Sequence, residues 1–457
     1  MAAIKRLSVV TAVGLSLSLL PTGDAFAFTF TKIADTSGSF TRLETPVIND
    51  SGTVAFSADL NTRSPSVFTG NGEALTSIVT FPPNPIFDFP SIGVGRILVE
   101  VIDINNAGTI LFAASQLVGN DLPRDITNFF TLSSGTSTPP SISSSGDPRR
   151  QSYGVYAIND NGSIASRSIE TQLGIITSAS VDVTNNGTHK GGVSLMDRFE
   201  SSRFLFFENP DLNNSDTLVF GARLVNENTP DRPIFIDGLF TRTSDGIISP
   251  VVTTNISGNP FSSSVFSPAS INDNGTVAFG MRPLDQFDNL ISLQNDIIFT
   301  SNAGSSTTIA DTSGPFKSFG NPAINNTGTV AFFGTLDTGG SGIFTGADPI
   351  TNKVITLGDS LFGSKVVSLD FSTKGLNNSG QLAFLATFED GTSGIFRANP
   401  ESMSEPKSVP EPASGLGLLL VGVFGVGSLL KGKQKRQQSA SSVTTDLNLG
   451  QKPIAMP

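Results

Sequence analysis

The chain has 457 residues, no cysteine and a single histidine, and its formal net charge is −11 at pH 7. This composition excludes structural disulfides, thiol catalysis and metal sites built from several histidines or cysteines. Because no basic patch stands out and an acidic surface repels phosphate backbones, we predict that the chain does not bind nucleic acid.

The first 27 residues have the pattern of an export signal. Lys5 and Arg6 precede an apolar run over 7–20, and an Ala-Phe-Ala sequence ends at Ala27. This order is typical of a secretory signal peptide, so we predict a signal helix over 1–27 with cleavage between Ala27 and Phe28. The alternative is a retained membrane anchor.

The region 28–399 contains seven copies of one phrase, which first appears as Ile-Asn-Asp-Ser-Gly-Thr-Val-Ala-Phe at 48–56. The first asparagines of successive copies stand 52 to 59 residues apart. Asparagine opens a turn with its side chain, and glycine supplies the positive φ that reverses the chain. The Thr-Val-Ala-Phe segment that follows predicts a strand. The turn positions are Asn49 and Gly52, Asn105 and Gly108, Asn159 and Gly162, Asn272 and Gly275, Asn325 and Gly328, and Asn377 and Gly380, with a weaker copy at Asn213.

Each copy carries further strand candidates, and four strands in about 55 residues match the size of one propeller blade. The segment 28–38 is similar to the fourth-strand segment 307–314, whereas the last copy ends at 395–397 without such a segment. We therefore predict an all-β fold, a seven-bladed β-propeller in which the N-terminal strand completes the last blade and closes the ring. A β-solenoid and tandem β-sandwiches are the alternative folds.

A second set of signals follows the repeats. A linker over 400–412 ends in Pro410-Glu411-Pro412, and an uncharged apolar stretch covers 413–430. That stretch predicts a transmembrane helix, and the basic residues after it would stay in the cytoplasm. We predict that 431–457 forms a basic cluster and a disordered cytoplasmic tail. The basic residues are Lys431, Lys433, Lys435 and Arg436.

The proline-containing motif, the apolar helix and the basic cluster together resemble the PEP-CTERM sorting domain of Gram-negative bacteria, over roughly 408–436. The resemblance implies recognition by an exosortase-type sorting protease, removal of the helix and delivery to the outer surface. Members of that family usually end soon after the basic cluster, whereas residues 437–457 follow here. An ordinary C-terminal membrane anchor is the alternative.

The repeat is also similar to the tandem NxxGxxAF repeats of bacterial surface proteins. The matching residues in the first copy are Asn49, Gly52, Ala55 and Phe56. That resemblance implies a surface protein and assigns no chemistry to particular residues.

Few side chains are candidates for chemistry. His189 lies in a Gly- and Asn-rich segment without a nucleophile elbow, so we interpret it as a solvated loop residue. Asp50, Asp160 and Asp273 stand where other copies have Asn, which favours a turn-forming role over catalysis. We predict no cofactor and no metal site. Calcium is the one ion that Asp-rich turns could suit, although no EF-hand loop is present.

Tyr153 and Tyr156 are the two tyrosines of the chain and are candidate carbohydrate contacts, with a structural edge as the alternative. Tryptophan is absent, and we assign the 35 phenylalanines mainly to the core.

From these observations we predict an exported, non-catalytic repeat protein, a scaffold or interaction module associated with the envelope or with exopolysaccharide. Its expected partners are the sorting protease, the inner membrane before processing, and an extracellular polysaccharide or envelope protein. It would first be anchored in the inner membrane facing the periplasm, and later lie at the outer surface or outside the cell. The alternative function is a carbohydrate-active enzyme, a glycoside hydrolase or lyase, whose carboxylates act at the central channel of the propeller.

Overall fold

The computed structural model describes residues 28–83, 97–116, 126–133, 142–143, 152–172, 175–226, 234–253, 264–266, 268–283, 296–302 and 304–401. The predicted signal peptide, sorting motif, transmembrane helix and basic tail lie outside these residues, and the first strand begins at Phe28. Within the described ranges, no helix has the length and apolar character that crossing a membrane requires.

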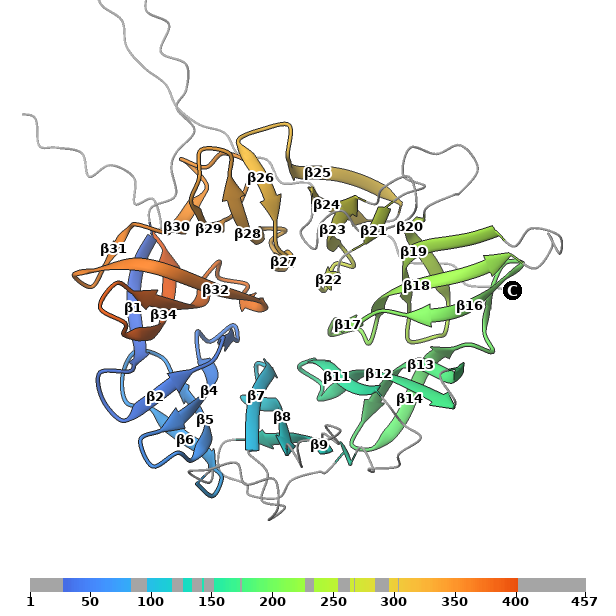
Figure 1. Ribbon diagram of the computed structural model, residues 1–457. Helices are drawn as coiled ribbons and strands as arrows, with labels where there is room; N and C mark the ends of the chain where they lie inside the picture. The colour runs from blue at the N-terminus through green and yellow to red at the C-terminus, as the bar shows by residue number, and fades with distance from the viewer. Residues whose placement is uncertain are drawn as a thin grey trace, which may run out of the picture. The chain divides into compact units, whose positions relative to one another are not determined.

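Seven antiparallel sheets are arranged around a common axis, so the described part of the chain forms a seven-bladed β-propeller (Figure 1). The first three blades contain β2 (Phe40–Leu43), β3 (Val47–Ile48), β4 (Val54–Leu60), β5 (Pro65–Gly70) and β6 (Thr76–Thr80); β7 (Ile97–Ile104), β8 (Thr109–Gln116), β9 (Ile126–Ser133) and β10 (Ile142–Ser143); and β11 (Ser152–Ile158), β12 (Ser163–Gln172), β13 (Ile175–Asn185) and β14 (Thr188–Ser194).

Blades 4 and 5 contain β15 (Arg198–Phe199), β16 (Ser202–Phe207), β17 (Asp211–Leu212), β18 (Leu218–Asn226), β19 (Ile234–Arg242) and β20 (Ile248–Thr253); and β21 (Ser264–Phe266), β22 (Ser270–Ile271), β23 (Val277–Pro283), β24 (Ile297–Asn302) and β25 (Ser305–Asp311). Blades 6 and 7 contain β26 (Phe316–Phe319), β27 (Ala323–Ile324), β28 (Val330–Leu336), β29 (Ser341–Phe344) and β30 (Lys353–Thr356); and β31 (Ser360–Leu361), β32 (Ser364–Leu376), β33 (Leu382–Phe388), β34 (Ser393–Pro400) and β1 (Phe28–Asp35).

The ring closes in blade 7 through a strand from each end of the described chain. β1 pairs antiparallel with β34, from Phe28 opposite Pro400 to Asp35 opposite Gly394. The predicted closure by the N-terminal strand is therefore confirmed, and the solenoid and sandwich alternatives are excluded. β34 ends at Pro400, one residue beyond the predicted end of the propeller at 399.

The strand after each repeat turn is buried on both faces, which places the core between neighbouring blades. Phe56 of β4 packs in a cluster with Ile395 of blade 7, whereas Ala55 packs in a cluster with Val101 of blade 2. Both side chains are fully buried. Since successive side chains of a strand point to opposite faces, the large residue fills the gap to one neighbour and the small residue permits close approach of the other.

The repeat turn has the geometry that its residues predict. The Asn49 Oδ1 accepts a hydrogen bond from the backbone N–H of Thr53 at 3.0 Å, and the N–H of Gly52 donates to the Asn49 carbonyl at 3.0 Å. Gly52 has φ +77°, a conformation that strongly favours glycine. In the weaker fourth copy Asp216 occupies this position with φ +57°, which aspartate tolerates better than most residues.

Candidate active site in the central channel

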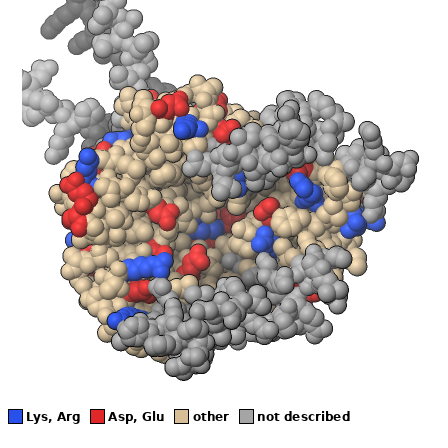
Figure 2. All heavy atoms as spheres, in the orientation of Figure 1, with Lys and Arg blue, Asp and Glu red and all other residues tan. Residues whose placement is uncertain are grey.

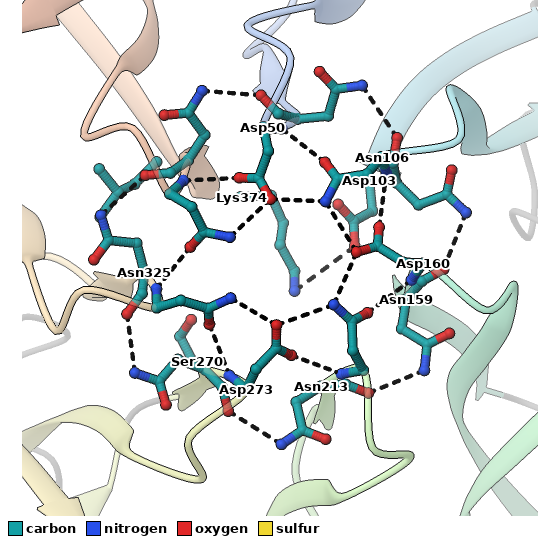
Figure 3. Close-up of a pocket in the computed structure, with 18 of the residues that line it drawn as sticks. Asp50, Asp103, Asn106, Asn159, Asp160, Asn213, Ser270, Asp273, Asn325 and Lys374 are labelled. Atoms are coloured by element: carbon teal, nitrogen blue, oxygen red, sulfur yellow. Dashed lines mark hydrogen bonds and ion pairs between the residues drawn. The ribbon is translucent and has the colours of Figure 1, made fainter. Parts of the chain in front are cut away.

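The first asparagines of the seven turns form a closed circle of hydrogen bonds around the axis (Figure 3). Asn49 Nδ2 donates to the Asn105 carbonyl at 3.2 Å, and Asn377 Nδ2 donates to the Asn49 carbonyl at 2.9 Å. Each asparagine thus shapes its own turn with Oδ1 and binds the next blade with Nδ2. The members are Asn49, Asn105, Asn159, Asn213, Asn272, Asn325 and Asn377, all buried.

A second circle, which we call the Asp/Asn ring, is formed by the residues that follow these asparagines. Each backbone N–H in it donates to the side-chain Oδ1 of the next member, and the Asn106 Nδ2 also donates to Asp50 at 2.7 Å and to Asp160 at 2.9 Å. The Asp/Asn interchange seen in the sequence is therefore an alternation of acceptors and donors between blades, and these aspartates bind their neighbours instead of shaping their own turns. The members are Asp50, Asn106, Asp160, Asn214, Asp273, Asn326 and Asn378.

A half-buried lysine crosses the channel beside these two circles. Lys374 Nζ lies 2.5 Å from Asp211 Oδ1 and 3.7 Å from Asp103 Oδ2, so one cation joins blade 7 to blades 4 and 2. Burial lowers the pKa of Lys374, but the attraction of the two carboxylates outweighs this effect and leaves the pKa above its ordinary value. Burial raises the pKa of Asp103 to about 6, against the attraction of Lys374. The cavity between the circles and Lys374 measures about 140 Å³.

The opposite end of the channel opens into a much wider cleft of about 910 Å³. Strand β7 shows how the two ends are related, because 98–102 line the cleft whereas 103–104 line the narrow end. Lys374 lines both spaces and lies between them. Acidic and basic side chains gather beside the central hollow of the propeller face in Figure 2.

Carboxyl groups from blades 1, 2 and 7 line this cleft. Arg42 Nη2 lies 2.6 Å from Glu44 Oε1. Desolvation raises the pKa of Glu44, and the nearby charges of Glu100 and Asp370 add to this effect against Arg42. Desolvation also raises the pKa of Glu100. Asp370 accepts hydrogen bonds from the Thr45 hydroxyl and, at 2.9 Å, from the N–H of Phe371.

Tyr156, one of the two predicted candidates for a carbohydrate contact, lines the cleft with its aromatic ring. Its ring centre lies 5.7 Å from the Arg167 guanidinium carbon, and burial raises the pKa of its phenol. A Cβ at Gly154 would lie 2.2 Å from the Tyr156 hydroxyl oxygen, so glycine is required there for the tyrosine to keep this position. The Tyr153 side chain lies outside the described residues.

The single histidine lies away from the cleft, and its predicted position in a loop is wrong. His189 belongs to β14, the outermost strand of blade 3, because Asn186 and Gly187 adopt positive φ and confine the turn to a tight hairpin. Its Nε2 lies 3.0 Å from Asp182 Oδ1, and its side chain is 61% exposed. Among the residues that the structure describes, no group of three or more histidine or carboxylate side chains is arranged to hold a metal ion.

Fold and site together define a seven-bladed β-propeller with a polar cleft over its central channel. The chain belongs to the family of unknown function DUF7453, whose sequence model matches residues 31–341 and 347–416. No curated protein matches the sequence.

Several solved propellers are similar to the chain in fold. A PL25 ulvan lyase bound to -[GlcA(1-4)Rha3S]- is 10% identical with a TM-score of 0.40, and the match covers 82% of this chain and 98% of the lyase. The polysaccharide lyase Uly1 is 9% identical with a TM-score of 0.40, over 87% of this chain and 94% of the lyase. An α-L-arabinanase of Penicillium chrysogenum is 12% identical with a TM-score of 0.32, over 68% and 94% of the two chains.

The sequence prediction that the chain is not an enzyme is corrected by these comparisons, since the similar propellers include polysaccharide lyases and glycosidases. The sequence contains no recognisable catalytic motif, and it does not show how far apart the carboxyl groups of different repeats lie. The carboxyl groups of the cleft come from separate blades and meet only in the folded ring. Because the likeness is one of fold, the chemistry must be sought in the cleft itself.

Proposed function

We propose that this protein is a carbohydrate-active enzyme that hydrolyses glycosidic bonds with carboxyl groups of the cleft. The observation that supports the proposal is a roomy cleft in which two glutamates have raised pKa values beside a hydrogen-bonded aspartate. Groups with perturbed pKa values concentrate at functional sites, and glycoside hydrolysis needs a carboxylic acid and a carboxylate in one site.

The two catalytic roles follow from the surroundings of each group. Glu100 is the proton donor, because desolvation favours its neutral form and no described residue forms a hydrogen bond or ion pair with its side chain. Asp370 is the base or nucleophile, because Thr45 and the N–H of Phe371 donate to its carboxylate oxygens. Glu44, paired with Arg42, is the alternative for the second role.

Hydrolysis fits the cations of the cleft better than elimination does. Elimination from a uronate needs a free cation or donor that neutralises the sugar carboxylate while its neighbouring proton is removed. Arg42 is paired with Glu44, and Lys374 is held by Asp211 and Asp103. Both cations that line the cleft in the described part of the chain are thus engaged.

The test is turnover of a polysaccharide panel by the purified protein, with reducing ends and the ultraviolet absorbance of unsaturated sugars measured together. We expect reducing ends without unsaturated products, and a loss of about 10²–10⁴-fold in kcat for Glu100→Gln. Glu389→Gln, at an exposed position in the β33–β34 turn, is the matched control and should retain activity. If unsaturated products form, the reaction is elimination and not hydrolysis. If the Glu100→Gln variant retains its activity, Glu100 is not the proton donor.

The predicted export is consistent with activity on a polysaccharide outside the cell. An exported propeller would meet extracellular polysaccharide, the partner that the terminal signals also suggest.

A further inference from the structure

Two arginines lie next to the cleft without being part of its carboxyl cluster. Arg167 of β12 packs against Tyr156, which lines the cleft, at 5.7 Å from the ring centre. Arg282 of β23 comes from blade 5, and both arginines attract Glu208 of blade 4. Glu208 directly precedes Asn209, another cleft residue. The Arg167 guanidinium therefore lies beside the Tyr156 wall of the cleft, and Arg282 lies close enough to Glu208 for their charges to interact.

The hydrogen-bonding capacity of these arginines is largely unused. The Arg167 side chain interacts with the Tyr156 hydroxyl. Arg167 Nη1 donates to the Phe207 carbonyl at 3.3 Å, and Arg282 Nη2 donates to Asn321 Oδ1 at 3.4 Å. Both distances are long for an N–H···O bond, and each guanidinium has five N–H donors. The buried Nε atoms of both side chains have no hydrogen-bond partner among the described residues. Desolvation lowers the pKa of Arg282, against the attraction of Glu208, so its charge is partly withdrawn from water.

Among the residues that the structure describes, the charges around Glu208 do not balance. Arg223 also attracts Glu208, but it holds Asp237 through two bonds of 2.7 and 2.8 Å. Glu208 is left as the carboxylate shared by Arg167 and Arg282. This local excess of positive charge stands in a chain whose net charge is −11. An anionic group of a ligand would balance it and use the spare donors.

We infer that Arg167 and Arg282 form a subsite for an anionic group, a carboxylate or a sulfate, on the glycan that occupies the cleft. The planar guanidinium fork matches the geometry of such oxyanions. Since neither arginine is among the residues that line the cleft with Glu100 and Asp370, the anionic group that they bind belongs to a sugar other than the one that is cleaved. The inference rests on the proposed function, and it narrows the substrate class to acidic glycans.

The test is calorimetric binding of matched oligosaccharides in about 0.15 M salt, where charges more than about 8 Å apart are largely screened. One arm uses uronate oligosaccharides, a second uses the same oligosaccharides after reduction of their carboxyl groups, and a third uses a sulfated neutral glycan. We expect the wild type to bind at least one anionic arm roughly tenfold or more tightly than the reduced arm. Preference for the uronate or the sulfated arm identifies the anion.

Arg282→Gln should abolish this preference, and Arg282→Lys should restore part of it through its charge. Arg63→Gln, at an exposed arginine of the β4–β5 loop, is the matched control and should leave it unchanged. Equal binding of the anionic and reduced arms by the wild type, or an unchanged preference in a folded Arg282→Gln variant, would overturn the inference. If the wild type releases reducing ends but binds anionic and reduced oligosaccharides equally, the subsite is refuted and the enzymatic function is not. If it prefers anionic oligosaccharides but shows no turnover, the enzymatic function is refuted and the subsite is not.

Discussion

The Asp/Asn ring makes a sharp prediction, because donors and acceptors cannot alternate around an odd number of blades. The chain places its one mismatch between Asn326 and Asn378, where two amides meet, and avoids placing two carboxylates side by side. Asn378 Nδ2 donates to Asp50 Oδ2 at 2.7 Å. Asn378→Asp replaces this donor with a carboxylate oxygen facing another carboxylate.

The cost of that change can be estimated in two ways. Two unit charges about 3–4 Å apart repel by about 4–6 kcal/mol at an effective dielectric constant of about 20. Protonating one carboxyl of ordinary pKa costs about 4 kcal/mol at pH 7 and about 1.5 kcal/mol at pH 5. Since the protonated oxygen can donate to Asp50 as the amide did, proton uptake limits the loss. We expect Asn378→Asp to lower the free energy of unfolding by up to about 4 kcal/mol at pH 7 and by much less at pH 5.

Urea unfolding of a double-mutant cycle at both pH values measures this loss. In Asp50→Asn/Asn378→Asp the number of charges is unchanged and the alternation is restored, with the mismatch moved to the junction with Asn106. The double variant should therefore be more stable than the sum of the single effects by about 2 kcal/mol or more at pH 7. Additive effects, or an Asn378→Asp variant as stable as the wild type at pH 7, would show that the ring bonds contribute little.

Further predictions concern the channel and the cleft. Lys374→Met leaves Asp103 and Asp211 buried without their cation and should cost about 3–5 kcal/mol, whereas Lys374→Met combined with Asp103→Asn and Asp211→Asn should recover most of the thermal stability. Because the pKa of Asp103 is raised from 3.8 to about 6, the folded state binds its proton more tightly than the unfolded state. Its contribution to stability, on the order of 3 kcal/mol, is present at low pH and lost as the pH rises through about 6, so Asp103→Asn should lack this part of the pH dependence in urea titrations. Gly154→Ala should displace Tyr156 and weaken glycan binding in calorimetry without unfolding the protein.

The blade number and the closure could be predicted from the sequence because both are written in local, repeated chemistry. Asn49 and Gly52 specify a hairpin turn on their own, and the same turn recurs once in each blade. The closure was visible because 28–38 carries an outer-strand segment that the last repeat lacks. The bonds between blades were not visible, since Asp50 and Asp160 find their partners only when neighbouring turns meet around the axis.

The cleft could not be predicted by a search for motifs, yet it follows a positional rule within the repeat. The residue five positions before the first asparagine of a turn lines the cleft in blades 1, 2, 3 and 7. This position is acidic in blades 1, 2 and 4 and small in blades 3, 6 and 7. The residues are Glu44, Glu100, Glu208, Gly154, Gly320 and Ser372.

Within each repeat, the residues that hold the blades together occupy different positions from the residues that could act on a ligand. Asn105 must bind the next blade and is therefore repeated, whereas five residues earlier Glu100 faces open space and is free to differ between blades. Lys374 lies between the narrow end of the channel and the cleft. It forms ion pairs with the buried Asp103 and Asp211, and these carboxylates neutralise its charge. The narrow end of the channel is thus occupied by hydrogen bonds and ion pairs between blades, and the wide end can present carboxyl groups to a ligand without weakening these contacts.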